Sequence, residues 1–550
     1  MLKDFIICFF TIPSQLMPTT DTKISVTDFR TECPEDLSTL HQRRTISSAH
    51  LKPPRNEIAK LQPLAQVKSE NKYRHAAVVH SVPRTSCLSH ESQVAPSFLG
   101  FRNLMVLVLI VGNLRLMMEN FTKANDHSIF SKKKYGVLIC VQCHNYRSQD
   151  ILLGVALLLV IPCHLFLAYI VELIAAQQAR SSVQLKKDRD GTATPGGSYI
   201  ASEKEKREFK KTWQIVAWIH GLNASLCLLI TSIVVYFFIH HPLIGTLIEV
   251  HALIVWLKTA SYALTNRDLR DAYLYPSKRD QDAMPELYEK CSYPCNITLG
   301  NLIYFWWAPT LVYQPVYPRT PKIRWIFVAK RMAEVFSLNA FMWIASAQYA
   351  APVLRNSLDK MATLDLLSIL ERLMKLSTIS LMIWLAGFFA LFQSFLNALA
   401  EIMRFGDREF YRDWWNSPSV GVYWRTWNKP VYHFMKRHIY MPLISRGGNV
   451  KKANLIVFLF SAVLHELLVG IPTHNFIGVA FMGMMLQLPL VAITAPLEKM
   501  KGINGIILGN CIFWISFTLI GQPLAALLYF FAWEAKYGSA SRQAGAFKAE

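Results

Sequence analysis

The chain has 550 residues, of which 52% are apolar, 12% aromatic and only 17% charged, and its formal net charge is +21. A disordered protein carries few aromatic and many charged residues, so this composition excludes that class. The apolar residues gather in runs such as 151–176 and 506–533, each long enough to cross about 30 Å of hydrocarbon, which predicts a multi-spanning membrane protein rather than a soluble enzyme.

The first hundred residues differ from the rest of the chain. They are polar, rich in Ser, Thr, Pro and His, and show no lasting period. Such a composition predicts a disordered cytoplasmic tail over 1–100. We expect a membrane domain over 101–535 and a short luminal tail over 536–550.

The membrane domain is predicted to be all-α, because only helices or closed barrels satisfy backbone polar groups in lipid. Apolar runs of sufficient length predict about nine transmembrane helices. These lie at 103–121, 151–176, 214–238, 243–263, 327–353, 375–401, 453–471, 475–496 and 506–533.

Basic residues between these spans indicate how the spans are oriented. If the N-terminal tail is cytoplasmic, so are three basic loops: the loop after the second span, 264–326 and 402–452. The opposite connections at 240–242 and 472–474 contain no Lys or Arg, although 122–150 is basic and breaks the pattern. Lys and Arg are retained in cytoplasmic loops, so the majority predicts a luminal C-terminus after nine spans. The positive charge thus reports topology and does not point to nucleic acid.

The ten cysteines include two close pairs, Cys140 with Cys143 and Cys291 with Cys295. Zinc ligands must converge on one ion, but the topology places these pairs on opposite faces of the membrane. We therefore predict no metal site.

A segment after the sixth span combines aromatic and basic residues. It begins with the motif FYRDWWN, which consists of Phe410, Tyr411, Arg412, Asp413, Trp414, Trp415 and Asn416. Aromatic side chains with a polar edge favour the headgroup region, so we expect amphipathic helices on the cytoplasmic membrane surface. An anchor for neighbouring spans is the simpler interpretation, but anchoring does not require the amides of Asn416 and Asn428.

The seventh span contains His465 and Glu466, and an ionisable residue inside a span is a functional candidate. Ser461 lies one turn before His465 on the same face and is expected to hold a ring nitrogen. A serine hydrolase is excluded, because no Gly-x-Ser-x-Gly elbow presents the Ser461 hydroxyl.

FYRDWWN and His465 resemble the membrane-bound O-acyltransferases, in the branch that contains sterol and diacylglycerol acyltransferases. Within that branch the chain is most similar to the type 1 diacylglycerol O-acyltransferase class. The supporting motifs are WAPTLVY at 307–313, YPRTP at 317–321, FGDRE at 405–409, RHIYMP at 437–442, AFMGMMLQ at 480–487 and GQP at 521–523. A histidine of the family is shifted here, to Tyr432-His433, and the basic residues after Tyr440 are arranged differently.

The resemblance implies an acyl-CoA-dependent esterification of diacylglycerol to triacylglycerol in a chamber enclosed by the spans. In that chamber His465 is the general base, and Asn428 positions or stabilises the reacting groups, with Ser461, Glu466, Gln487 and Gln522 as supporting residues. Candidate ligands of acyl-CoA, which is a substrate and not a cofactor, are Trp427, Lys436, Arg437, Tyr440, Lys451 and Lys452. The resemblance also implies membrane lipids as partners, a homo-oligomer (dimer or tetramer) and the endoplasmic reticulum membrane.

Two alternatives stay open at this point. One is acylation of a sterol or a long-chain alcohol, which needs a site shaped for that acceptor. The other is a transporter with a structural histidine, although the sequence lacks the internal repeat that many transporters show.

Overall fold

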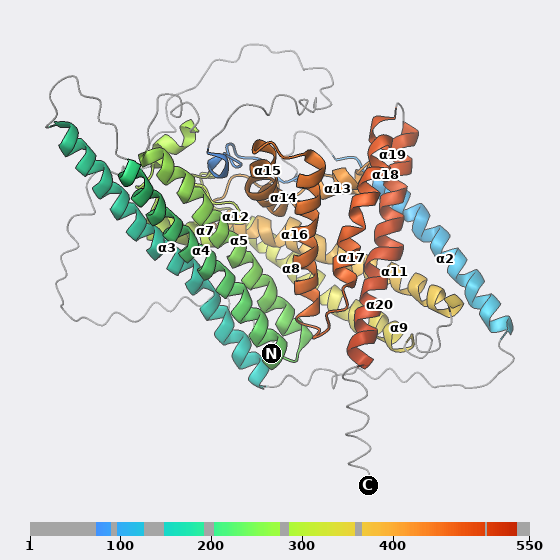
Figure 1. Cartoon of the computed structure of the whole chain (residues 1–550). Coiled ribbons are helices and arrows are strands. Elements are labelled where there is room, and N and C mark those ends of the chain that lie inside the picture. Colours follow the sequence, from blue (N-terminus) through green and yellow to red (C-terminus); the bar gives the residue numbers. More distant parts are fainter. Residues whose placement is uncertain are drawn as a thin grey trace, which may run out of the picture. The chain divides into compact units, whose positions relative to one another are not determined.

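Long helices make up most of the chain in the computed structural model (Figure 1). The structure describes residues 73–89, 96–125, 148–191, 203–274, 285–357, 366–500 and 503–535. These residues contain no β-strand beyond two isolated bridges. The predicted all-α architecture is therefore confirmed, whereas Cys140, Cys143 and the tail 536–550 lie outside the described residues.

The α-helices are bounded as follows. They are α2 (Leu99–Asn125), α3 (Ser148–Gly191), α4 (Glu203–Phe238), α5 (Pro242–Leu274), α7 (Leu299–Trp307), α8 (Trp325–Ala345), α9 (Ala351–Arg355), α11 (Leu366–Phe388), α12 (Leu396–Ile402), α13 (Val420–Thr426), α14 (Lys429–Met435), α15 (Met441–Ser445), α16 (Val450–Gly470), α17 (Val479–Met485), α18 (Gln487–Lys499), α19 (Ile503–Ile515) and α20 (Gln522–Trp533). Four π-helical segments join them, namely η5 (Ser346–Ala350), η6 (Phe389–Phe395), η8 (Lys436–Tyr440) and η9 (Ser516–Gly521).

Eight helical segments of the described residues are long and apolar enough to cross a membrane. They correspond to eight of the nine predicted spans, so the count of nine is not confirmed. The remaining prediction, 327–353, coincides with α8, η5 and part of α9. Its first turns contain Lys330, Arg331 and Glu334, which make it more polar than the others.

Helix α8 nevertheless runs beside the spans as one arm of a helical hairpin. It packs against α11, η6 and α12. At its start, the backbone N–H of Arg324 donates to Glu401 near the end of α12 (2.8 Å), and the two side chains form an ion pair (3.1 Å). The chain therefore leaves along α8 and returns along α11–α12 to the same side.

Connections that the charge pattern places on one side meet each other in the structure. Val79 N–H in the N-terminal region donates to Gln314 (2.9 Å), and Arg84 N–H donates to the carbonyl of Gly406 (3.0 Å). These bonds join the predicted tail to the loops 264–326 and 402–452. On the other side, His474 Nδ1 donates to the carbonyl of Tyr236 near the end of α4 (2.6 Å). The His474 ring also lies 5.8 Å from the His240 ring, so the two connections without Lys or Arg meet.

The predicted disordered tail is corrected for its last part. Residues 73–89, which we call the strap, lie along the helical core, and Tyr73 and Ala76 are buried. The strap is held mainly by its backbone: His75 N–H donates to Asp268 of α5 (2.8 Å), and Arg408 N–H donates to the carbonyl of Arg84 (2.9 Å). Sequence periodicity does not reveal a segment that is fixed by such scattered bonds. Residues 1–72 lie outside the described part of the chain.

Candidate functional site

Helix α16 carries the predicted base. Asn449 caps its N-terminus, because the side chain accepts a bond from Lys451 N–H (2.9 Å). Four turns later, His465 Nδ1 lies 2.7 Å from the backbone carbonyl of Ser461 and 3.4 Å from its hydroxyl. A carbonyl can only accept, so Nδ1 carries the proton and Nε2 keeps its lone pair. Ser461 thus contacts the ring, and its carbonyl rather than its hydroxyl makes the shorter bond.

Glu466, predicted as a supporting site residue, holds helices together. One carboxylate oxygen accepts from Gly478 N–H (2.9 Å). The other accepts from Phe481 N–H (3.0 Å) and from the Tyr529 hydroxyl (2.8 Å). These bonds cap α17 and connect α16 to α20, so the structure gives this carboxylate a positioning role and no bond toward His465.

Asn428 caps α14, a helix that precedes α16 in the chain. Its side-chain oxygen accepts from Val431 N–H (3.2 Å), which leaves the amide NH2 as a donor. Helices α14, α15 and α16 are neighbours in Figure 1. The faces of α14 and α16 share one apolar cluster, which includes Val431, Phe434, Met435, Val457, Phe460 and Leu464. Asn428 therefore lies at the start of a helix that shares this cluster with α16, including Leu464, the neighbour of His465 in the chain.

The two predicted glutamines occupy different environments. Gln487 accepts a bond from Trp424 Nε1 of α13 (3.3 Å) and donates to the carbonyl of Gly483 (3.1 Å). Gln522 is half-buried at the first position of α20, directly after η9. Gln487 thus ties α18 to the aromatic segment.

The aromatic residues of FYRDWWN are buried, which corrects their predicted place at the membrane surface. Trp414 and Trp415 have 0% exposure, and Phe410 and Tyr411 are buried as well. The Trp414 ring contacts Trp384 (5.1 Å between centroids), Phe388, Tyr423 and Trp514. A run of aromatic residues is compatible with a headgroup region and with a protein core, and in this structure the run packs in the core.

The polar residues of the motif divide into two groups. Arg412 and Asp413 are exposed, and Arg412 pairs with Glu409. Asn416 accepts from Gly100 N–H (2.8 Å) and donates to the carbonyl of Ser97 (2.6 Å), so it anchors the start of α2. A Cβ on Gly100 would lie 1.7 Å from the Trp415 carbonyl, which explains the glycine.

The predicted ligands of acyl-CoA differ in access. Lys436 is exposed in η8, and Lys451 and Lys452 are exposed on the first turn of α16, while Trp427 and Tyr440 are half-buried. Arg437 does not fit the prediction. It is buried and donates to the carbonyls of Tyr313 (3.0 Å) and His75 and to Thr265 (3.1 Å). Arg437 therefore holds the strap instead of facing a ligand.

Two buried histidine contacts were missed from the sequence, because their strap residues fell in the predicted tail. His75 Nδ1 lies 3.0 Å from His438 Nδ1, and His438 Nε2 lies 2.7 Å from the Ser261 hydroxyl. The pKa of His75 is lowered to about 3, by burial first and then by Arg267, Arg437, Arg446 and Arg74. Burial and Arg437 also lower the pKa of His438, so both rings are neutral at pH 7, and one Nδ1 donates its proton to the other.

The second contact is a chain of three residues. His80 Nδ1 donates to Asp407 (2.8 Å), and its Nε2 lies 2.8 Å from the Thr310 hydroxyl. Thr310 also accepts from Val312 N–H (3.2 Å). All three side chains are buried, so this chain fastens the strap to the loops on either side of it.

Lys258 of α5 is a further residue that the sequence did not single out. It is buried, and its Nζ donates to the carbonyls of Phe305 (2.8 Å), Trp306 (2.9 Å) and Ala308 (2.8 Å) at the end of α7. Pro309 has no N–H to continue that helix. Lys258 therefore supplies donors to the carbonyls of Phe305 and Trp306 and uses its third at the Ala308 carbonyl, which also accepts from Thr310 N–H (2.7 Å).

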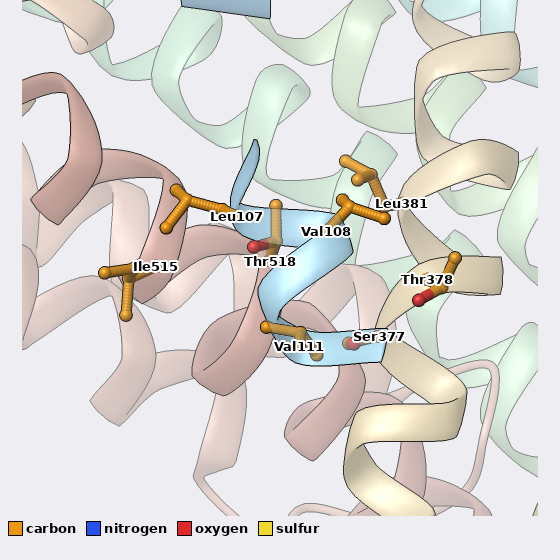
Figure 2. A pocket seen from close by; sticks show the side chains of 8 residues that line it. All are labelled: Leu107, Val108, Val111, Ser377, Thr378, Leu381, Ile515 and Thr518. Carbon is orange, nitrogen blue, oxygen red and sulfur yellow. The ribbon is translucent and has the colours of Figure 1, made fainter. Parts of the chain in front are cut away.

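Figure 2 shows a small cleft away from these residues. It is lined by Leu107, Val108, Val111, Ser377, Thr378, Leu381, Ile515 and Thr518. The hydroxyls of Ser377 and Thr518 donate to carbonyls of their own helices. The cleft contains none of the predicted site residues, so it is not the candidate reaction site. Among the described residues, no group of three or more His, Cys, Asp or Glu is placed to hold a metal.

Comparison with known proteins agrees with the motifs. The model of the membrane-bound O-acyltransferase family matches residues 273–531. Diacylglycerol O-acyltransferase 1A of Glycine max is 36% identical over 464 residues, which are 83% of this chain and 82% of that protein. Diacylglycerol O-acyltransferase 1 of Arabidopsis thaliana is 36% identical over 83% of this chain and 78% of its own length. The Dictyostelium discoideum protein of the same name is 35% identical over 81% of this chain and 64% of its own length.

Proposed function

The chain belongs to the membrane-bound O-acyltransferase family, and we propose that it transfers the acyl group of a fatty acyl-CoA to the hydroxyl of diacylglycerol, forming triacylglycerol. It is a multi-pass membrane enzyme of the O-acyltransferase class. The observation that carries the proposed mechanism is the ring of His465, which lies inside an apolar span with Nε2 free to accept a proton. Acyl chains and diacylglycerol partition into the hydrocarbon region of the bilayer, so a base inside a span can reach both.

The reaction follows from that ring. Nε2 of His465 takes the proton of the diacylglycerol hydroxyl while the hydroxyl oxygen attacks the thioester carbon. The tetrahedral intermediate then collapses, the carbon–sulfur bond breaks, and the imidazolium returns the proton to the coenzyme A thiolate. The carbonyl of Ser461 keeps the proton on Nδ1 at the start of each cycle.

The developing oxyanion needs a donor in a dry site. Asn428 has an amide NH2 that its capping bond does not use, and it caps a helix that shares an apolar cluster with α16. Gln522 is half-buried and is a second candidate, whereas Gln487 already shares its amide between Trp424 and Gly483.

Acyl-CoA and diacylglycerol act as substrates in this proposal, and no cofactor takes part. The protein resides in the endoplasmic reticulum membrane as a homo-oligomer. The side that holds the strap and the loops 264–326 and 402–452 faces the cytosol, where acyl-CoA is available, and the C-terminus is luminal. The clustering of these basic loops supports this orientation.

Purified protein with labelled oleoyl-CoA, offered diacylglycerol, cholesterol and a fatty alcohol in competition, tests the acceptor. We expect triacylglycerol as the main product, and a preference for cholesterol or the alcohol would replace the proposal with its alternative. His465→Ala should lower kcat by about 10²–10⁴ at equal amounts of monodisperse protein. His251→Ala, which changes another histidine inside a span, is the matched control. If His465→Ala turns over about as fast as this control, His465 is not the general base.

A further inference from the structure

Three arginine side chains surround one phenylalanine ring where α8 begins. The guanidinium carbons of Arg324, Arg331 and Arg408 lie 4.9, 5.4 and 5.9 Å from the centroid of the Phe327 ring. A guanidinium is attracted to an aromatic face, so this one ring holds three like charges close together. Arg324 and Arg331 belong to the start of α8, and Arg408 follows α12, the helix on which α8 packs. Positive charge is therefore concentrated where the two ends of the helical hairpin meet.

Two carboxylates balance only part of this charge. Glu401 of α12 pairs with Arg324 (3.1 Å) and with Arg408 (2.5 Å). Glu334 pairs with Arg331 (2.6 Å). Among the described residues, three guanidinium groups are thus paired with two carboxylates, which leaves one positive charge. Like charges at this separation repel, so the cluster favours a bound anion.

Two N–H donors of the cluster have no acceptor. The Nε of Arg331 and the Nη2 of Arg408 are buried and make no hydrogen bond to the described residues. A buried donor without an acceptor is costly, and both of these belong to guanidinium groups that face the Phe327 ring. The side chains of Arg324 and Arg331 are 39% and 21% exposed, so they connect this ring with the surface. A phosphate oxygen supplies the acceptor that is missing, because a guanidinium binds phosphate through two N–H groups at once.

The cluster lies at the level of lipid headgroups. Glu401 is next to the end of a candidate span, Leu366–Ile402, so the arginines that it binds lie where this span leaves the hydrocarbon. Trp325 and Ile326 at the start of α8 are 65% and 75% exposed and offer apolar surface beside the charges. The exposed Lys330 lies about 60° around α8 from the cluster and adds a further cation. Cations at the membrane surface attract anionic lipids, and the apolar surface beside them favours a lipid over a free anion.

We propose that Arg324, Arg331 and Arg408 bind the phosphate of an anionic glycerophospholipid, whose acyl chains lie along the exposed side of α8. The bound lipid holds the start of α8 to the end of α12 and stabilises the hairpin. This site explains why a helix that runs beside the spans carries charged residues in its first turns. It is separate from His465 and does not depend on the acyltransferase function.

Lipid binding by the purified full-length protein tests the site. We would record native mass spectra during titration with phosphatidylglycerol, with phosphatidylcholine and with inorganic phosphate. Arg331→Gln and Arg408→Gln each remove one guanidinium. Glu334→Gln removes a competing carboxylate but keeps an oxygen for the Ser394 hydroxyl, which donates to Glu334 (2.7 Å). Arg372→Gln is the matched control, because Arg372 of α11 is 26% exposed and also pairs with a glutamate.

We expect saturable binding of phosphatidylglycerol, with an affinity about tenfold lower for Arg331→Gln and for Arg408→Gln. Glu334→Gln should bind more tightly than the unaltered protein, and Arg372→Gln should bind equally well. Because a ligand stabilises the state that binds it, phosphatidylglycerol should also raise the Tm of the unaltered protein more than that of Arg331→Gln. If Arg408→Gln does not fold, Arg331→Gln and Glu334→Gln, which change half-buried residues, still decide the outcome.

Four results would overturn the proposal. The first is one affinity for phosphatidylglycerol in the unaltered protein, Arg331→Gln and Glu334→Gln. The second is an equal loss of affinity in Arg372→Gln, which would reduce the effect to net charge. The third is equal binding of phosphatidylcholine, because the anionic headgroup then has no part in recognition. The fourth is displacement of phosphatidylglycerol by the same concentration of inorganic phosphate, which would make the cluster a site for free anions.

Discussion

Replacing Lys258 with Met examines whether a buried ammonium holds the end of α7 in place. The methionine side chain is about as long as the lysine stem and has no hydrogen-bond donor, so all three donors are removed. The carbonyls of Phe305, Trp306 and Ala308 then lose the partners that lie 2.8, 2.9 and 2.8 Å away in the unaltered protein. The Ala308 carbonyl keeps the bond from Thr310 N–H (2.7 Å), whereas Pro309 has no N–H to offer the Phe305 carbonyl, so the carbonyls of Phe305 and Trp306 are left without a donor.

The magnitude follows from two opposing contributions. Each buried acceptor left without a donor costs about 1–3 kcal/mol, so the carbonyls of Phe305 and Trp306 together cost roughly 2–6 kcal/mol. Removal of the ammonium also removes the penalty for burying a charge, which is several kcal/mol. We expect the cost of the two unpaired carbonyls to exceed the relieved burial penalty, with a net loss of about 2 kcal/mol in the free energy of unfolding. Lys258→Arg should recover little stability, because a planar guanidinium cannot direct three N–H donors from a single nitrogen toward three carbonyls.

The assay is thermal unfolding of purified protein, followed by tryptophan fluorescence and compared with Lys322→Met, which alters an exposed lysine. Lys258→Met should melt several degrees below that control. Turnover should fall as well, because Leu311 and Val312 after the capped turn pack with Leu464 beside His465. A Tm within about one degree of the control would refute the assignment of Lys258 as the cap.

Three further predictions address the site, the strap and the topology. Asn428→Asp keeps the capping oxygen but removes the amide donor, so kcat should fall about 10²–10³ with an unchanged Tm; a normal kcat would leave Asn428 as a cap only. Burial and nearby arginines lower the pKa of His75 to about 3, so its contribution to stability is complete above pH 6.5 and declines as the pH falls toward 3. Acidification from pH 7 to 5 should thus cost about 2 kcal/mol through this residue, and an equal pH dependence of unfolding in His75→Asn would contradict this. In sealed microsomes, a membrane-impermeant thiol reagent should add label to Lys322→Cys and none to His240→Cys; the reverse result would invert the proposed orientation.

The sequence alone determined the features that depend on the composition of a continuous segment. A run of about twenty apolar residues is stable across a bilayer whatever surrounds it, so eight spans were evident without a structure. The absence of Lys and Arg at 240–242 and 472–474 likewise predicted that these connections lie on the same side. His465 could be recognised because an ionisable residue in an apolar run is expensive wherever it points.

The tertiary structure decided which partner each polar or aromatic group takes. Trp414 suits a headgroup region or a core, and only its neighbours from α11, α13 and α19 place it in the core. Arg437 resembles a phosphate ligand in sequence, yet it turns toward the carbonyl of a residue 362 positions away. Lys258 is recognised as a cap only once the end of α7 lies beside it, because the three carbonyls come 47, 48 and 50 residues later in the chain. A hydrogen-bond partner is set by long-range packing, whereas the free energy of transferring a segment into lipid is set by the segment itself, and this difference separates what the sequence predicted from what it could not.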